Sequence, residues 1–236
     1  MELIGVIIDQ IPIKEKDAMV RILTDEGVIG VYARRIMSLT NPYFAALQPF
    51  SIAKLIINQG RDGGLSLSQA QLINSLTIDS LSYQHLTSLQ LIGELILSGV
   101  MIDNWSDLKS LLIKLLTKFA KTINPYLLTA YFLAQFLAQA GWRMVIDGCA
   151  ICQRKTDIVA IDFNFGGYVC RDHYQENSSK PLPADLLKTF RYLLLLDVDQ
   201  IEHLNLKEEQ QIKLLKLLVE FYTYHTNKRI KNIELI

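Results

Sequence analysis

Short apolar segments that alternate with polar residues fill the first seventy positions of the chain. Five such segments are rich in β-branched and other apolar residues: 3–11, 18–24, 27–33, 51–58 and 65–70. Asp25-Glu26-Gly27, between the second and third segments, favours a tight hairpin turn. Gly60 to Gly64 marks another turn, before the fifth segment. Five short strands joined by tight turns predict a small antiparallel barrel or sandwich.

From about residue 80 the spacing of apolar positions becomes helical. Leucines recur in steps of three and four residues from Leu108 to Phe119, which predicts one amphipathic face. The next segment begins with Asn124-Pro125, the pattern of an N-cap followed by proline at the first helical position. It is apolar on nearly all sides up to Gly141, so we expect this helix at the centre of a bundle.

Two more helices are expected towards the C-terminus, at 184–197 and 206–226. Asn205 and Glu208 have the spacing of a capping box at the start of the last helix. Pro181 and Pro183 precede the first of the two helices and close an intervening segment that lacks helical periodicity.

That segment, residues 148–175, contains all three cysteines of the chain in the pattern C-x2-C-x17-C-x2-H. The ligands would be Cys149, Cys152, Cys170 and His173. Zinc prefers four such ligands in a tetrahedron, and two closely spaced pairs can supply them. The residues between the pairs alternate in polarity around Gly166-Gly167, which predicts a hairpin that returns the second pair to the first. Four protein ligands leave no position for water, so the zinc is interpreted as structural.

Three other interpretations of these residues compete with structural zinc. The cysteines could be buried thiols beside an incidental histidine, but two paired spacings argue against that. A redox C-x-x-C would lack its surrounding βαβ pattern and leave Cys170 and His173 unexplained. A zinc enzyme would need an open coordination position at the metal.

Charge does not single out a function for the whole chain, because 24 basic residues balance 24 acidic ones. Nucleic-acid binding would therefore require a local patch. Arg34-Arg35 is the one local pair near the N-terminus, and Lys228-Arg229 with Lys231 makes another near the C-terminus. An ordinary solvated charge cluster is the alternative for each. The candidate DNA contacts are Lys14, Lys16, Arg21, Arg34, Arg35, Lys228 and Arg229.

Several other classes of chemistry lack their sequence patterns. Neither glycine-rich phosphate-loop pattern occurs, and neither does G-x-S-x-G, so no catalytic constellation is predicted. The N-terminus does not have the pattern of a signal peptide. Residues 126–142 contain polar side chains and are too short for a membrane-spanning helix. We therefore expect a soluble cytoplasmic protein with no membrane partner.

The order of these features resembles the bacterial recombination mediator family RecO over nearly the whole chain. The resemblance is carried by the first three strands, by two further stretches, by the cysteine insert and by the C-terminal helix. The quoted stretches are residues 3–35, Ala46-Leu47-Gln48-Pro49-Phe50, Leu65-Ser66-Leu67-Ser68-Gln69-Ala70 and residues 224–231.

The resemblance implies an α+β protein: a five-stranded antiparallel OB-fold barrel at 1–78, then a helical domain at 79–236 with a zinc-binding insert at about 148–180. It implies a non-enzymatic mediator that binds single- and double-stranded DNA and anneals complementary strands. The implied partners are RecR, the tail of single-stranded-DNA-binding protein and, indirectly, RecA, in the bacterial cytoplasm at the nucleoid.

The sequence departs from that family at two places. The loop after the third strand is usually densely basic, whereas here it carries only Arg34 and Arg35, which implies fewer phosphate contacts. The fourth metal ligand is His173, where cysteine is common. The balanced charge of residues 1–80, with seven basic and eight acidic residues, keeps open an alternative function, a protein-interaction adaptor with weak or no direct DNA binding.

Overall fold

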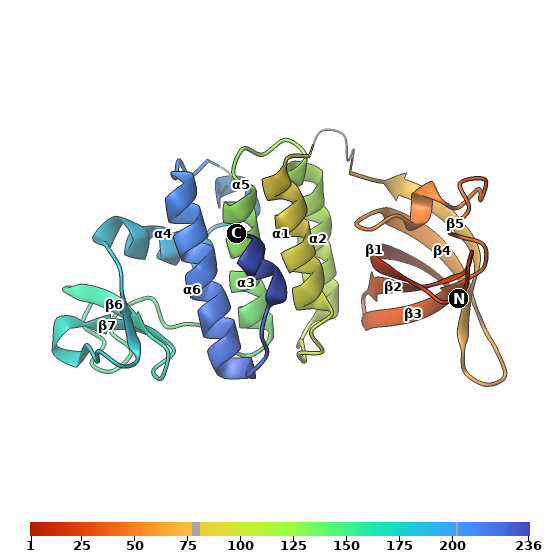
Figure 1. Ribbon diagram of the computed structural model, residues 1–236. Coiled ribbons are helices and arrows are strands. Elements are labelled where there is room, and N and C mark those ends of the chain that lie inside the picture. The colour runs from red at the N-terminus through yellow and green to blue at the C-terminus, as the bar shows by residue number, and fades with distance from the viewer. Residues whose placement is uncertain (77–80, 202) are drawn as a thin grey trace. The chain divides into compact units, whose positions relative to one another are not determined.

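The computed structural model describes three stretches of the chain, residues 1–76, 81–201 and 203–236 (Figure 1). The chain divides into two compact units. The boundary that the sequence predicts between residues 78 and 79 lies outside the described residues.

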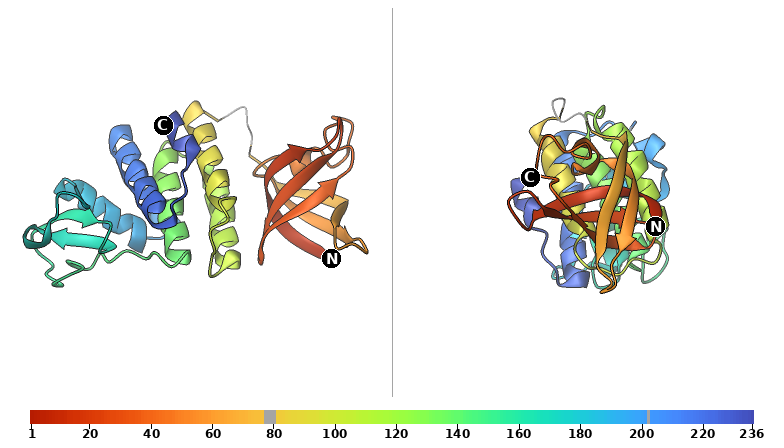
Figure 2. Two further views of the ribbon diagram at one scale, coloured as in Figure 1. Left: turned by 60° about the horizontal axis from the view of Figure 1, so that its bottom comes forward. Right: turned by 90° about the vertical axis from the view of Figure 1, so that its right-hand side faces the viewer.

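The N-terminal unit, residues 1–99 with 104–121, contains a closed five-stranded barrel (Figure 1; Figure 2). Its strands are β1 (Glu2–Pro12), β2 (Ala18–Thr24), β3 (Gly27–Ala33), β4 (Ile52–Gln59) and β5 (Leu65–Asn74). Their order around the barrel is β1-β2-β3-β5-β4. Neighbouring strands are antiparallel except at the closing contact, where Tyr32 of β3 and Ser66 of β5 pair in parallel. The barrel is OB-like, as predicted.

The long first strand is what allows the barrel to close. β1 pairs with β4 through its first half and with β2 through its second half, and its register shifts between Ile7 and Asp9. Such a bulge bends the strand and increases its twist. Inward-pointing aliphatic side chains then fill the barrel, and Ile7, Ile22 and Leu55 are fully buried.

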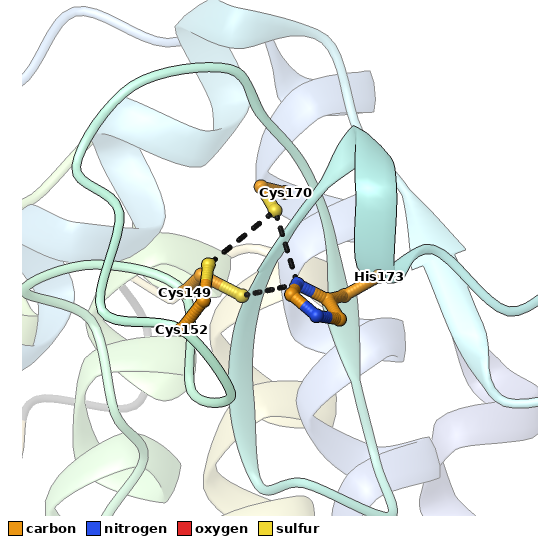
Figure 3. Close-up of side chains that lie close together, drawn as sticks. All are labelled: Cys149, Cys152, Cys170 and His173. Atoms are coloured by element: carbon orange, nitrogen blue, oxygen red, sulfur yellow. Dashed lines mark hydrogen bonds between the residues drawn. The ribbon is translucent and has the colours of Figure 1, made fainter.

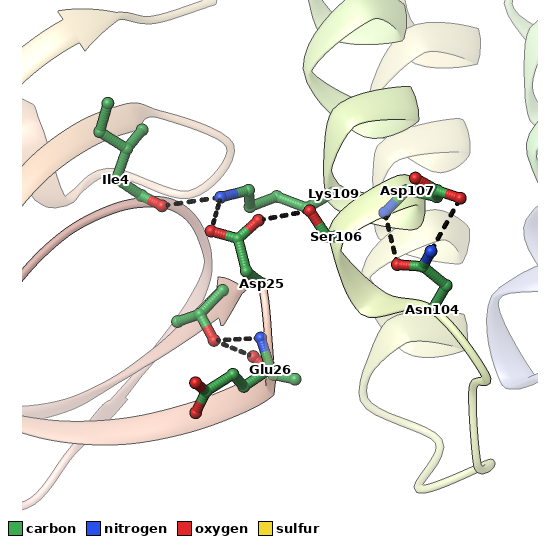
Figure 4. A network of polar contacts seen from close by, with 9 residues as sticks. Ile4, Asp25, Glu26, Asn104, Ser106, Asp107 and Lys109 are labelled. Atoms are coloured by element: carbon green, nitrogen blue, oxygen red, sulfur yellow. Dashed lines mark hydrogen bonds and ion pairs between the residues drawn. The ribbon is translucent and has the colours of Figure 1, made fainter.

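Two helices belong to the same unit, α1 (Tyr83–Ile96) and α2 (Trp105–Phe119). The predicted amphipathic face of α2 is buried. Near its start, Lys109 is only 7% exposed, and its ammonium donates to the carbonyl oxygen of Ile4 at 3.2 Å and pairs with Asp25 at 2.7 Å (Figure 4). Ser106 donates to the same carboxylate at 2.8 Å. The hairpin turn predicted at Asp25 is therefore also the anchor of α2.

The C-terminal unit, residues 100–103 with 122–236, is a helical bundle that carries a small sheet. Its helices are α3 (Pro125–Gln139), α4 (Ala184–Leu195), α5 (Val198–Ile201) and α6 (Glu208–Thr226). Its sheet has the strand order β7-β6-β8, with β6 (Ile158–Asp162), β7 (Gly167–Cys170) and β8 (Ser179–Pro181). Twelve of the fifteen residues of α3 are buried, so the prediction of a central helix is confirmed.

The sequence predicts two caps for α3, at Asn124-Pro125 and at Gly141, and one for α6, at Asn205. Pro125 begins α3 as expected, and Gly141 follows its end with a left-handed φ of 84°. Asn124 precedes the helix but makes no capping bond, because its side-chain oxygen accepts from Gln211 of α6 at 2.6 Å.

The predicted capping box at Asn205 is wrong. α6 begins at Glu208, two residues later than predicted, and its N-cap is Lys207. The side chain of Gln210 accepts the backbone N–H of Lys207 at 3.1 Å, so the first turn forms there. Among the described residues, no helix combines the length and apolar character needed to cross a membrane.

Candidate metal centre and candidate nucleic-acid surface

Three local elements bring the four predicted metal ligands together. Cys149 and Cys152 lie in a tight turn, in which the N–H of Cys149 donates to Arg154 at 2.8 Å and its carbonyl accepts from Gln153 at 2.8 Å. Cys170 ends β7, and His173 follows in the short 3-10 helix η3 (Arg171–His173). The predicted hairpin of β6 and β7 returns the second pair to the first, and the four side chains point toward one another (Figure 3).

The separations of the ligand atoms fit one metal ion. All four ligand atoms lie within 4.8 Å of one another. His173 Nδ1 lies 3.6 Å from Cys149 Sγ and 3.3 Å from Cys170 Sγ, and the Sγ atoms of Cys152 and Cys170 are 3.8 Å apart. In a tetrahedron with Zn–S bonds of about 2.3 Å, sulfur atoms lie about 3.8 Å apart. The group could hold a metal ion, and its donor set is compatible with zinc.

The backbone around the turn also favours the thiolate form that binds a metal. Burial raises the pKa of the Cys149 thiol, but backbone N–H groups of Cys152, Cys170 and Ile151 outweigh burial and lower that pKa to about 6. The turn depends on Gly148, because a Cβ there would lie 2.7 Å from the carbonyl oxygen of Gln153. A thiolate at neutral pH is the ligand that zinc requires.

We call residues 145–181 the metal module; the core cluster around its candidate ligands is very small. This cluster consists of Cys149, Ala160, Val169 and Cys170, so two of its four buried members are candidate ligands. The buried carboxylate of Asp162 orders the nearby loops by accepting the hydroxyls of Ser178 at 2.5 Å and Ser179 at 2.6 Å.

The arginines of the metal module do not form a free cationic surface. Arg154 pairs with Asp172 at 2.6 Å, and Arg171 pairs with Asp157 at 3.4 Å. Both guanidinium groups are therefore balanced by carboxylates.

Four of the predicted DNA contacts lie at one end of the barrel. Lys14 and Lys16 are exposed in the loop before β2, and Arg34 and Arg35 are exposed directly after β3. The N–H of Met37 donates to the carbonyl oxygen of Lys16 at 3.0 Å, so the two loops lie side by side. We call these four residues the basic end.

The other three predicted contacts lie elsewhere. Arg21, in the middle of β2, makes a two-pronged ion pair with Asp9 of β1. Lys228 and Arg229 belong to the C-terminal unit, and Arg229 pairs with Glu234. The structure therefore groups four of the seven residues and leaves three outside that group.

Sequence reasoning missed a groove of about 860 Å³ in the C-terminal unit. α6, the metal module and the final 3-10 helix η4 (Lys231–Leu235) line it. Its apolar side chains are Phe163, Val219, Ile230 and Ile233, and Lys216 stands at its edge with no ion-pair partner in the described part of the chain. These residues come from segments far apart in sequence, so no local pattern could have indicated the groove.

An OB-like barrel followed by helices that carry a three-cysteine, one-histidine group defines an α+β class of protein. The chain belongs to the recombination protein O family. The profile described as Recombination protein O N terminal matches residues 1–76, and the one described as Recombination protein O C terminal matches residues 103–234. The family assigns the chain a role in recombination and DNA repair.

Individual relatives align with this chain over most of their length. The DNA repair protein RecO of Streptococcus thermophilus is 25% identical over 240 residues, which cover 98% of this chain and 91% of that protein. The protein of the same description from Syntrophomonas wolfei is 24% identical and covers 89% and 85%. That from Listeria monocytogenes is 23% identical and covers 98% and 92%.

Proposed function

We propose that this protein is a non-enzymatic recombination mediator that binds single- and double-stranded DNA through the basic end of its barrel. In this role it anneals complementary strands and, with RecR, helps load RecA onto strands coated by single-stranded-DNA-binding protein. Its place of action is the bacterial cytoplasm, at the nucleoid. The metal is structural zinc held by Cys149, Cys152, Cys170 and His173.

The observation that carries the DNA-binding proposal is the pairing of two cation-bearing loops at one end of an OB-like barrel. Two lysines and two arginines there are exposed, and no ion pair occupies any of the four within the part of the chain that the structure describes. Loops at the mouth of such a barrel commonly contact a nucleic-acid backbone. Arg21 is a weaker candidate, because a bound strand would have to compete with Asp9 for its guanidinium.

The groove in the C-terminal unit favours a second candidate function, a protein-interaction adaptor. An apolar floor beside the unpaired ammonium of Lys216 suits a peptide tail that presents an apolar side chain and its terminal carboxylate. The tail of single-stranded-DNA-binding protein is the occupant we propose. Both functions can coexist in one chain, since the basic end and the groove belong to different units.

One pair of titrations separates the two functions. Arg34→Ala with Arg35→Ala should weaken single-strand binding by about tenfold or more at low salt and reduce the slope of log K against log salt by about two, because two phosphate contacts are lost. The double variant should bind the tail peptide normally. Lys216→Ala should weaken binding of the tail peptide and leave single-strand binding unchanged. Unchanged DNA affinity in the double variant would remove the basic end from the DNA surface.

A further inference from the structure

Asp17 is an acidic residue inside the basic end, and it touches three separate segments. Its carboxylate accepts the hydroxyl of Tyr32 from β3 and the backbone N–H of Arg35, the latter at 2.8 Å. Its own carbonyl oxygen accepts the N–H of Ile13 at 3.0 Å, which closes the loop before β2. Asp17 therefore joins that loop, a barrel strand and the loop after β3.

These bonds fix the backbone that presents the cations. Arg35 has a φ of 58°, in the left-handed region that non-glycine residues adopt infrequently. The Asp17 carboxylate holds the N–H of Arg35 in that conformation, and Asn41 donates to the Arg35 carbonyl at 3.2 Å from the other side. The Tyr32 hydroxyl, followed by the Arg35 N–H, lowers the pKa of Asp17, so the carboxylate is ionised at neutral pH.

An ionised carboxylate among four cations repels phosphate, so charge alone makes Asp17 unfavourable for DNA binding. Glu15 offers a direct comparison, because it is exposed in the same loop and makes no hydrogen bond or ion pair to any residue that the structure describes. The two residues carry the same charge two positions apart. Of these two carboxylates, only that of Asp17 bonds to the loop after β3, beside the backbone bond from Met37 to Lys16 that also joins the two loops.

We infer that Asp17 is a positioning residue, whose carboxylate holds the two cation-bearing loops in the arrangement that contacts phosphate. The inference rests on the proposed function. Asp17 then strengthens DNA binding, because the gain from positioned cations exceeds the repulsion between its carboxylate and phosphate.

The test compares variants that change charge identically but differ in hydrogen bonding. Asp17→Ala removes the charge and both accepted bonds, whereas Asp17→Asn removes the charge and keeps an oxygen acceptor. Glu15→Ala removes a nearby charge and none of the bonds. Single-strand affinity is measured for each full-length variant by fluorescence anisotropy at several salt concentrations, and thermal unfolding confirms that the barrel remains folded.

We expect Asp17→Ala to bind about three- to tenfold more weakly and with a salt slope smaller by about one, because one phosphate contact is lost. Asp17→Asn should restore wild-type binding or exceed it, and Glu15→Ala should bind as wild type or more tightly. Equal binding by Asp17→Ala and Asp17→Asn, or tighter binding by Asp17→Ala than by wild type, would overturn the inference.

Two further variants complete the design. If Asp17→Ala unfolds the barrel, Tyr32→Phe tests the same arrangement, because it removes one hydrogen-bond donor and keeps the ring. Wild-type affinity and salt slope in Tyr32→Phe would then count against the positioning role. The Arg34→Ala and Arg35→Ala double variant is measured alongside. If it binds normally, the proposed DNA surface has failed; if it binds weakly while Asp17→Ala does not, only the positioning role has failed.

Discussion

The barrel and the metal module are both small β structures, yet different forces hold them together. The barrel encloses a core of twelve buried apolar residues drawn from its strands and the adjoining loops. The metal module has three short strands and a local core cluster of only four buried residues, of which two are cysteines of the candidate metal group. Its larger buried side chains, such as Phe163 and Tyr168, contact Phe221 of α6 and Phe190 of α4 instead. Burial of apolar surface stabilises folded proteins in proportion to the area removed from water. The barrel's own core cluster is three times the size of the module's own cluster, so the module depends more on packing against the helices and on its polar contacts.

The difference explains where each region tolerates polar residues. The barrel keeps its interior aliphatic and places its charged residues on the outside and at the basic end. The module buries the carboxylate of Asp162 and satisfies it with two hydroxyls and a backbone N–H from Phe165 at 3.1 Å. Hydrogen bonds order the loops of the module, and the metal coordination that we propose would join its two ligand pairs, whereas aliphatic packing fills the barrel.

Removal of the metal should produce the largest effect and should be confined to the module. Cys149→Ser removes one of the four ligands and a strong chelator removes the bound ion, so the turn at Cys149 and Cys152 is no longer tied to Cys170 and His173. We expect backbone amides of β6 and β7 to lose their protection from hydrogen exchange, while β2 and β3 keep theirs. Mass-spectrometric hydrogen exchange measures both in one experiment, and metal analysis of the wild type should give about one zinc per chain. Loss of protection across the barrel as well would contradict the separation of the two regions.

A cavity in the barrel should destabilise the N-terminal unit moderately and leave the metal module unaffected. Leu55 is fully buried among aliphatic neighbours, so Leu55→Ala should lower the free energy of unfolding of the N-terminal unit by about 2–5 kcal/mol. Zinc content should stay at the wild-type value. Leu39, which is 83% exposed, gives the matched control, because the same truncation there removes almost no buried contact. Chemical denaturation of the purified variants measures the free energy of unfolding, and metal analysis measures their zinc content. Zinc loss in Leu55→Ala would show that the module depends on the barrel.

The same contrast explains which features the sequence revealed. Alternation of apolar residues predicted β2 and β3 to the residue, because their inward positions must be apolar to fill the barrel. The ligand spacing identified all four members of the metal group, since coordination needs those residue types at short intervals. Both signals are local in sequence.

Features that depend on distant residues were not predictable in this way. Asn124 bonds to Gln211, 87 positions away, and that contact replaces the expected helix cap. No local pattern points to a role for Asp17, because only the folded barrel brings Tyr32 and Arg35 to its carboxylate. The groove beside Lys216 likewise exists only once the metal module and the C-terminal segment meet α6.

The smallest expected effect concerns the contact between α2 and the barrel, and it depends on pH. The ammonium of Lys109, followed by the hydroxyl of Ser106, lowers the pKa of Asp25. A carboxyl group whose pKa is lower in the folded state stabilises that state above its unfolded pKa of about 3.9. The stabilisation is lost as the pH falls through the lowered pKa of the folded state.

We therefore expect the melting temperature of the N-terminal unit to decline below about pH 4 more steeply in the wild type than in Asp25→Asn, which cannot ionise. Trp105 of α2 lies beside Gly27 of the hairpin and reports on this unit, provided that Trp142 is first replaced by phenylalanine. Fluorescence melting curves between about pH 2.5 and 6 then compare the two proteins without signal from the C-terminal unit. A metal bound in that unit would be released in acid, because its ligands must be deprotonated. Parallel pH profiles would show that the Asp25–Lys109 pair does not stabilise the packing of α2 on the barrel.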